Sequence, residues 1–395
     1  MPRSLWRNLR HSIAEPAVYA TNLAQARLRR SLGKGPRPVR ILLTSDEDAF
    51  TSEQQWAPLR RWSSALRNRL GVASRWLHLA KTRELQSDAF REFDVVGLKI
   101  THRATDAQAG AIASQLRERA EGSGCRLVYF DGDDDMCVQW PEVLAAVDLY
   151  VKKQVFADPK NYARRFVGKS NLTDYVARSF GTSFADNEIP ESGIVRPADA
   201  AKLFLGWNIA LDDKIQDLAR RLLGVPLPAK DVDVMCRATV PKQNWMFPLR
   251  DGVRVRLEAM ASSYRILAPS APVPQQQYYQ ELQRSRICVS PFGYGELCWR
   301  DFEAILCGCL VVKPEMSHLT TRPAAFVAGV TYAPVRWDYA DLEEVCARYA
   351  ADEPARKRIA DRALQELRTC FSSVWFVGVF EELLARLELA GSDGA

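Results

Sequence analysis

The sequence predicts an α/β protein built from two Rossmann-like α/β/α domains that face each other across a cleft. The chain has 395 residues, which is more than one hydrophobic core usually serves, so two domains of about 150–200 residues each are expected. In both halves, short apolar runs alternate with helix-length segments, and this alternation is typical of mostly parallel sheets. A content of 47% hydrophobic and 26% charged residues is that of a globular chain.

The elements group into four expected segments, which are a basic arm at 1–37, a first domain with its linker at 38–225, a second domain at 226–372 and a C-terminal helix with tail at 373–395. Apolar runs predict strands at 39–45, 73–79, 94–100, 126–130, 148–151, 231–236, 264–268, 286–290 and 309–313. Helices are expected at 52–69, 106–120, 246–262, 275–284, 297–307 and from 339 to about 390. Residues 157–225 are less regular and are expected to form excursions and an interdomain linker.

Cysteine usage and hydropathy point to a protein of the cytoplasm. The chain has nine scattered cysteines, and an odd number without paired spacing argues against a disulfide framework. It has no run of about 18 apolar residues and no secretory signal pattern at its start, so neither a spanning helix nor export is expected. We therefore expect the thiols to be reduced core residues.

The net charge of +6 is concentrated in the N-terminal arm. Residues 1–40 carry one acid, Glu15, and nine bases, which are Arg3, Arg7, Arg10, Arg27, Arg29, Arg30, Lys34, Arg37 and Arg40. Apolar residues are interleaved with these bases, so the arm is either an interfacial helix on an anionic membrane surface or a solvated, partly disordered leader. Nucleic acid is not an expected partner, because the rest of the chain shows no reading motif.

The stretch from 288 to 314 carries the strongest chemical pattern. A strand is expected to end at Ser290, and a turn containing Gly293 and Gly295 follows it. The two glycines leave backbone N–H groups free to approach a phosphate at the start of the next helix. This part of the sequence therefore predicts an anion-binding turn.

Charged residues follow on the predicted helix and at the end of the next strand. Glu296, Arg300 and Glu303 are four and three residues apart, which predicts one helix face. Arg300 offers a fork to phosphate, a glutamate suits the hydroxyls of a ribose, and Lys313 ends the following strand. The competing interpretation is an ordinary strand–turn–helix–strand unit in which Glu296 and Arg300 form a surface ion pair.

The whole run resembles the donor-binding region of GT-B glycosyltransferases, above all the bacterial exostosin-like and fucosyltransferase-like groups. The matching residues are Gly295-Glu296, Trp299-Arg300, Glu303-Ala304, Gly308 and Leu310-Val311-Val312. The resemblance implies a GT-B fold in which the second domain holds a nucleotide-sugar donor and the first lies on the acceptor side. It also implies that Glu296 and Arg300 contact the nucleotide.

The sequence departs from these families at two places. Glu296 and Glu303 are seven residues apart instead of eight, and Leu297 stands where fucosyltransferases have a lysine. Donor identity therefore does not carry over. His318, one of four histidines, is expected to face the donor phosphates or act as an acid, or else to be a loop residue bonded to backbone.

An aspartate-rich loop is the first candidate for the catalytic base. Asp131, Asp133, Asp134 and Asp135 follow the predicted strand 126–130. A divalent-metal site of the kind that GT-A glycosyltransferases have is the alternative for this Asp-x-Asp pair, but it would leave residues 288–314 without a role. We expect Asp131 or Asp133 to line the cleft as a base, and an Asp/Gly-rich turn is the structural alternative. Asp46 and Asp48 form a weaker second candidate.

Asp231 and Asp233 are the second catalytic candidates. They alternate with apolar residues and so point to one side of a strand, with Arg237 or Lys242 as expected partners. The chain is similar in size and plan to bacterial β-Kdo transferases, which use CMP-Kdo with retention and an aspartate nucleophile near mid-chain. That resemblance implies a nucleophile at Asp231 or Asp233, whereas the structural interpretation is an interdomain hinge.

The sequence thus predicts a glycosyltransferase that moves a sugar from a nucleotide-activated donor to a glycan or lipid-linked acceptor in bacterial surface polysaccharide assembly. We expect no metal and no cofactor, because Arg300, Lys313 and a helix N-terminus supply positive charge. A cytoplasmic enzyme, peripheral on the inner face of the plasma membrane, is expected. The alternatives are the β-Kdo transferase, a nucleotide-sugar epimerase, and a nucleotide- or glycan-binding protein without catalysis.

Overall fold

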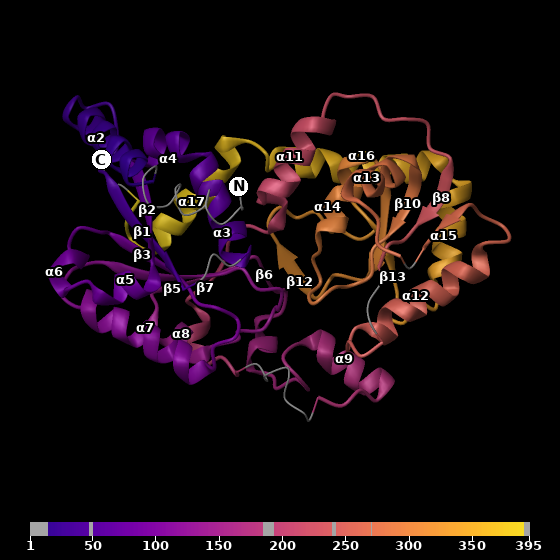
Figure 1. Cartoon of the computed structure of the whole chain (residues 1–395), viewed down its shortest axis with the longest axis horizontal. Coiled ribbons are helices and arrows are strands. Elements are labelled where there is room, and N and C mark those ends of the chain that lie inside the picture. Colours follow the sequence, from indigo (N-terminus) through magenta and orange to yellow (C-terminus); the bar gives the residue numbers. More distant parts are fainter. Residues whose placement is uncertain (1–14, 47–49, 185–192, 239–241, 270, 391–395) are drawn as a thin grey trace.

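The computed structural model describes residues 15–46, 50–184, 193–238, 242–269 and 271–390, and these form two α/β units joined side by side (Figure 1). Each unit is built on a wholly parallel sheet with helices packed around it. The predicted fold class, two Rossmann-like α/β domains, is confirmed.

The N-terminal sheet has six strands in the order β2-β1-β3-β4-β5-β7. The strands are β1 (Val39–Ser45), β2 (Val72–His78), β3 (Val95–Lys99), β4 (Arg126–Asp131), β5 (Leu149–Lys152) and β7 (Leu203–Leu205). The longer helices of this half are α2 (Glu15–Ser31), α3 (Phe50–Arg61), α4 (Ser63–Leu70), α7 (Asp106–Ala120), α9 (Asn171–Phe180) and α11 (Asp213–Leu222). Shorter helical pieces are α5 (Leu79–Glu84), α6 (Ser87–Phe90), α8 (Pro141–Ala146), α10 (Pro197–Ala200), η2 (Pro159–Ala163) and η3 (Ile209–Leu211).

The C-terminal sheet has five strands in the order β13-β11-β10-β8-β9. They are β8 (Val232–Met235), β9 (Ile266–Leu267), β10 (Ser285–Val289), β11 (Leu310–Pro314) and β13 (Ala333–Val335). The helices are α12 (Phe247–Met260), α13 (Gln275–Arg284), α14 (Trp299–Leu306), α15 (Leu342–Ala351), α16 (Glu353–Thr369) and α17 (Ser373–Arg386). None of the described helices is both long and apolar enough to cross a membrane.

In both sheets the strand order reverses next to the first strand, and this is where open α/β sheets bind ligands. In the C-terminal sheet the reversal lies between β8 and β10. The carboxyl ends of these strands are Met235 and Val289, so Ser290 and its turn start at the reversal point. The strand order therefore places the predicted anion-binding turn at the edge of the sheet where a ligand is expected to bind.

The predicted strands and the long helices are confirmed to within a few residues. The helix expected at 52–69 is two helices, α3 and α4, which meet at Trp62. The region 157–225, expected to be irregular, contains α9 and α11, and the short strands β6 (Gln154–Phe156), β7 and β12 (Leu319–Thr321) were not predicted. Strands of three residues are too short to show a period of two, and their partners lie far away in the sequence.

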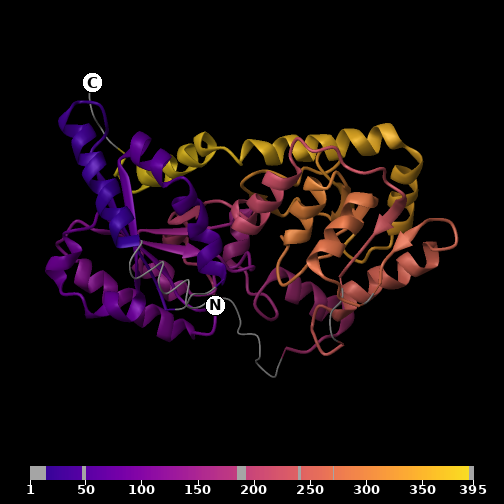
Figure 2. The same cartoon turned by 45° about the horizontal axis from the view of Figure 1, so that its top comes forward.

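Two backbone crossings tie the domains together. The chain runs through α16 along the C-terminal domain and returns in α17 to the N-terminal one (Figure 2). There the Phe376 ring centroid lies 5.1 Å from that of Trp62 and 4.9 Å from that of Trp207. The second crossing is the antiparallel pair of β6 with β12, which joins a segment after β5 to a segment after β11.

The two domains are in close contact at Gly295. A Cβ atom built there would lie 2.1 Å from the carbonyl oxygen of Asp134, in the aspartate loop of the N-terminal domain. Distances this short do not occur between real atoms, so this position has room only for hydrogen. Gly295 is predicted to expose its backbone to a phosphate, and the contact with Asp134 requires a glycine at the same position.

Gly295→Ala is expected to lower the free energy of unfolding by about 1–3 kcal/mol, because its methyl group would push the aspartate loop away. Gly293→Ala is the matched control, since the nearest atom to its Cβ would be Arg250 Nη2 at 3.6 Å. Urea denaturation of both variants measures the difference. Equal stability of the two would contradict this account of the interface.

Candidate functional site

The turn after β10 is held in place by one buried carboxylate, Asp301. Its Oδ1 accepts hydrogen bonds from Ser290 Oγ at 2.5 Å and Lys313 Nζ at 3.1 Å. Its Oδ2 accepts the backbone N–H of Cys298 at 2.9 Å, which caps the start of α14. Ser290 and Lys313 are fully buried, so these two predicted donor contacts act in the structure as supports of the turn.

Two arginines flank the turn. Arg250, from α12, donates from Nε to Phe292 O at 3.2 Å, and Arg300, from α14, reaches Pro291 O with Nη1 at 3.4 Å. Burial and the neighbouring Arg300 charge lower the pKa of Arg250. Within the described residues Arg300 forms no ion pair. The positive charges of Arg250 and Arg300 both lie at the glycine turn, and together they suit an anion with more than one negative charge.

Tyr339 adds a hydrogen-bonding group to the same place. It is 1% exposed, its backbone is left-handed with φ of 57°, and no hydrogen-bond partner meets its hydroxyl among the described residues. Burial raises the pKa of this phenol, and the charges of Arg250 and Arg300 oppose the rise, so the hydroxyl lies in their field. A strained backbone and an unmet buried hydroxyl beside two arginines are typical of a ligand site.

Glu296 lies at the domain junction instead of on a helix face with Arg300. Helix α14 begins only at Trp299, so the spacing argument for one shared face fails. The carboxylate is 1% exposed and accepts hydrogen bonds from Gln154 Nε2 at 3.1 Å and Asn171 Nδ2 at 2.8 Å. Both partners belong to the N-terminal half, so Glu296 bonds one domain to the other.

His318 completes this junction from the C-terminal side. Its Nε2 lies 3.3 Å from Glu296 Oε1, and its ring centroid lies 5.1 Å from that of Trp337 in an edge contact. The ring nitrogen therefore meets a carboxylate, and the alternative of a histidine bonded to backbone does not describe it. His318 thus contacts the same carboxylate that Gln154 and Asn171 bind from the other domain.

Glu303 is also turned into a domain contact. It accepts hydrogen bonds from the hydroxyls of Tyr278 and Tyr279 at 3.0 and 3.1 Å, and it pairs with Lys214 Nζ at 2.7 Å. Lys214 lies on α11 of the N-terminal half. The predicted ribose contact thus has three partners within the protein.

The aspartate loop lies against the glycine turn, as its predicted place at the cleft requires, through the Asp134–Gly295 contact. Each of its four carboxylates pairs with a separate lysine, and the pairs are Asp131–Lys152 (2.6 Å), Asp133–Lys99 (2.6 Å), Asp134–Lys153 (2.7 Å) and Asp135–Lys169 (2.7 Å). Asp131 and Asp133, the two predicted bases, are buried with their lysines. The ammonium groups of Lys152 and Lys99 therefore occupy one oxygen of each of these two carboxylates.

Asp135 differs from its neighbours. Burial raises the pKa of its carboxyl to about 6, and Lys169 opposes the rise only in part. Its Oδ1 is buried and has no hydrogen-bond partner among the described residues. A carboxyl that titrates near neutral pH is the better general base of this loop.

The structure moves Asp231 and Asp233 away from the site. Asp231 precedes β8, at the opposite edge of the sheet from the turn, and binds Arg284 Nε at 2.8 Å. Asp233 binds Arg286 and the backbone N–H of Arg265. The expected partner Arg237 pairs instead with Glu281. The partners of both aspartates belong to the C-terminal domain, so the two aspartates do not join the domains as a hinge would. Both lie at the start of β8, whose carboxyl end is at the ligand edge, so the structure does not place a nucleophile there beside the turn.

Asp46 and Asp48 are the weaker catalytic candidates, and the structure describes only the first of them. Asp46 accepts the backbone N–H of Thr101 at 3.1 Å at the carboxyl edge of the N-terminal sheet, whereas Asp48 lies outside the described residues. Over the described part of the chain, no three or more His, Cys, Asp or Glu side chains come together in a way that could hold a metal ion.

Sequence reasoning missed four residues of this region, which are Arg250, Tyr339, Gln154 and Asn171. Arg250 lies within the predicted helix 246–262, and Tyr339 is at the predicted start of a later helix, so neither stood out as a ligand contact. Gln154 and Asn171 are uncharged, and Asn171 lies in the region 157–225 predicted to be irregular. Only their position opposite Glu296 in the folded chain gives them a role.

The family model described as "Glycosyl transferase-like" matches residues 245–376, from just before α12 to the start of α17. The match covers both arginines, the turn, α14 and β11, so this part of the C-terminal domain is similar to the class that the sequence predicts, the glycosyltransferases. It does not distinguish the exostosin-like, fucosyltransferase-like or β-Kdo groups. No curated protein matches the chain.

Solved structures of similar layout include three enzymes that act on sugars. A glycosyltransferase from Rickettsia africae is 9% identical over 91% of this chain and 100% of its own, with a TM-score of 0.48. A UDP-forming α,α-trehalose-phosphate synthase from Burkholderia vietnamiensis is 12% identical (88% and 99% covered, TM-score 0.45). A UDP-GlcNAc 2-epimerase from Neisseria meningitidis, bound to UDP-GlcNAc, is 11% identical (88% and 100% covered, TM-score 0.43). These likenesses are too remote to assign an activity.

The raised pKa of Asp135 predicts a pH dependence of stability. The carboxyl favours the folded state while it is protonated, and this contribution is lost as pH rises from the unfolded value, near 4, through the folded value of about 6. Wild type should therefore lose about 2 kcal/mol relative to Asp135→Asn between about pH 4 and about pH 7.5. Urea denaturation at the two pH values measures it, with Asp134→Asn as control. A constant difference between wild type and Asp135→Asn would contradict the raised pKa.

Cys298 is predicted to be the reactive thiol of the native protein. All nine cysteines are free and eight are buried, whereas Cys298 is part-exposed at the start of α14. Mass spectrometry after brief treatment with iodoacetamide should show one adduct, at Cys298, and none in Cys298→Ser. An adduct that appears first at another cysteine would show that the turn is less accessible than described.

Proposed function

We propose that the protein is a glycosyltransferase that takes its sugar from a nucleotide-activated donor and binds that donor at the turn after β10. The observation that carries the proposal is the pair of arginines, Arg250 and Arg300, beside the turn at the ligand edge of the domain that matches the glycosyltransferase-like model. Open sheets of this order bind nucleotides at the same place.

The arginines would bind the phosphates of the donor. Their guanidinium groups approach the turn from α12 and α14, and the Tyr339 hydroxyl, which lies in their field, adds a hydrogen-bond donor. In sugar transfer, negative charge builds up on the phosphate that leaves the anomeric carbon. Charges fixed beforehand in a partly buried site stabilise that charge without reorganisation, which is the largest single contribution in many enzymes.

The aspartate loop would receive the acceptor. It lies against the turn through Asp134, so an acceptor hydroxyl held on the N-terminal side can reach the anomeric carbon. Asp135 is the proposed base, since its raised pKa and unpartnered Oδ1 distinguish it from Asp131 and Asp133. Such a base removes the proton of the attacking hydroxyl as the new glycosidic bond forms.

The proposed acceptor is a glycan or a lipid-linked saccharide in the assembly of a bacterial surface polysaccharide, on the cytoplasmic side of the plasma membrane. The resemblance to bacterial surface-glycan transferases supports this assignment. We expect turnover without added divalent cation, because two guanidinium groups provide the charge that the leaving phosphate needs. The β-Kdo alternative has no support from the positions of Asp231 and Asp233.

Arg300→Ala is expected to weaken nucleotide binding by about 10–100-fold, because one charge-assisted fork to the phosphates is lost. A thermal-shift panel of UDP, GDP, CMP and dTDP first identifies the nucleotide, since a ligand that binds the native state raises its melting temperature. Calorimetric titration of that nucleotide then compares wild type, Arg300→Ala and Arg300→Lys. Arg348→Ala is the control, because Arg348 pairs with Glu344 on the surface of α15.

Unchanged affinity in Arg300→Ala would remove the turn as the donor site. A product assay with the identified donor separates the enzyme classes. Conversion of the donor without any acceptor would identify an epimerase, and binding without turnover under all conditions would identify a binding protein.

A further inference from the structure

Helix α2 is firmly packed on the outer edge of the N-terminal domain. Its inner side presents Tyr19, Asn22 and Ala26, of which Asn22 and Ala26 are buried. Asn22 Oδ1 accepts a hydrogen bond from Arg67 Nη1 of α4 at 2.7 Å, and Arg75 of β2 lies over the Tyr19 ring. Residues 15–31 are therefore a docked helix, and the solvated leader considered for this part of the arm is not what the structure shows.

The opposite side of α2 is unusual for a face turned to water. Residues at helical spacing along it are Ala17, Thr21, Ala24 and Leu28, and Leu32 continues the row one turn further. Val18, Leu28 and Leu32 are 51%, 59% and 59% exposed. A helix on the surface of a globular protein normally turns charged residues toward the solvent. Helix α2 instead has apolar residues on its solvent side as well as on its packed side.

Arginines border this apolar row on both flanks. The segment 16–40 contains no acidic residue and six basic ones, Arg27, Arg29, Arg30, Lys34, Arg37 and Arg40. Arg27, Arg29 and Arg30 are exposed on α2, and Lys34 is exposed just after it. Arg37 and Arg40 pair with Asp94. The α2 face, defined as Ala17, Val18, Thr21, Ala24, Leu28 and Leu32 with the flanking bases Arg27, Arg29 and Lys34, is thus apolar in its centre and cationic at its borders.

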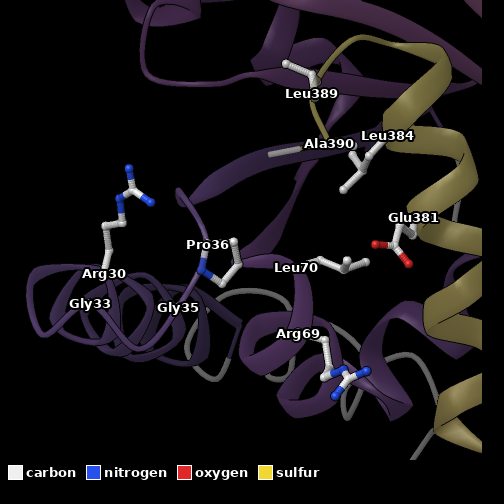
Figure 3. A pocket seen from close by; sticks show the side chains of 10 residues that line it. All are labelled: Arg30, Gly33, Gly35, Pro36, Arg69, Leu70, Glu381, Leu384, Leu389 and Ala390. Carbon is white, nitrogen blue, oxygen red and sulfur yellow. The ribbon is translucent and has the colours of Figure 1, made fainter. Parts of the chain in front are cut away.

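A cavity of about 440 Å³ adjoins the C-terminal end of α2 (Figure 3). It is lined by Arg30 of α2, Arg69 of α4 and Glu381 of α17, with leucines 70, 384 and 389. The carboxylate of Glu381 disfavours an anion there, so the cavity adds nothing to the argument. The docking surface is limited to the α2 face itself.

We propose that the α2 face docks the protein on an anionic lipid bilayer, with Leu28 and Leu32 entering the interface and the arginines meeting lipid phosphates. An apolar centre with cationic borders fits a surface that is itself anionic outside and apolar within. A protein partner would need complementary acidic side chains around an apolar groove, and this is an outcome of the test. The inference rests on the α2 face and not on the proposed nucleotide site.

The orientation that follows keeps the candidate site open. Helix α2 packs against β2, the edge strand of the N-terminal sheet, and β6, β12 and the domain junction lie at the other side of that domain (Figure 1). Docking through α2 therefore covers neither the glycine turn nor the aspartate loop.

Vesicle co-sedimentation of the full chain tests the proposal. Wild type should bind vesicles of phosphatidylglycerol with phosphatidylcholine, should not bind phosphatidylcholine alone, and should be released by salt. Leu28→Glu with Leu32→Glu should weaken binding at least about tenfold, and Arg27→Gln with Arg29→Gln about 30-fold, since each cation near an anionic surface contributes about a fivefold change. Val255→Glu and Arg348→Gln, on exposed helices of the C-terminal domain, are the matched controls.

Two further measurements keep the result specific. Thermal unfolding and nucleotide binding of the α2 variants should equal those of wild type, because the altered side chains are exposed and far from the turn. Deletion of residues 1–14 tests whether that basic segment binds by itself. The proposal is overturned if wild type ignores anionic vesicles, if the α2 variants bind like wild type, or if only the deletion abolishes binding. If the wild-type protein binds no nucleotide, the proposed function is wrong, but the vesicle-binding result still stands.

Discussion

The arrangement of the molecule depends on the contact between the glycine turn of one domain and the aspartate loop of the other. Gly295 has room for no side chain because the Asp134 carbonyl lies against it, and the next residue, Glu296, is bonded by Gln154 and Asn171 of the opposite domain. Buried acceptors with partners on both sides fix the relative position of two units more strictly than apolar packing does. The ligand edges of both sheets are thereby brought to one place.

The sequence predicted those features that depend on residues close together in the chain. Apolar runs located the strands, and the glycine turn with its following helix and strand located the ligand edge. The sequence did not predict side-chain roles that depend on contacts with residues far away in the chain. Glu296 and Glu303 looked like ligand contacts because acids near a glycine turn often are, yet each has partners contributed by the other domain. Asp231 and Asp233 alternate correctly for one strand face, but only the direction of β8 shows which end of the sheet they occupy.

The candidate site also shows how charge is distributed for function. The aspartate loop balances its four carboxylates with four lysines, so it presents little net charge to the junction. The turn places Arg250 and Arg300 together, and burial with the neighbouring Arg300 charge lowers the pKa of Arg250. Titratable groups perturbed in this way cluster at functional sites. An anionic donor and a neutral acceptor hydroxyl fit this contrast.

The central claim is that the two arginines bind phosphate, and it is tested most directly by comparing a nucleoside diphosphate with its own nucleoside in calorimetric titrations. The account predicts that wild type prefers the diphosphate by about a hundredfold or more. It also predicts that the double variant Arg250→Ala, Arg300→Ala, still folded, loses most of this preference. Equal affinity for nucleoside and nucleoside diphosphate, or an unchanged preference in the double variant, would contradict it.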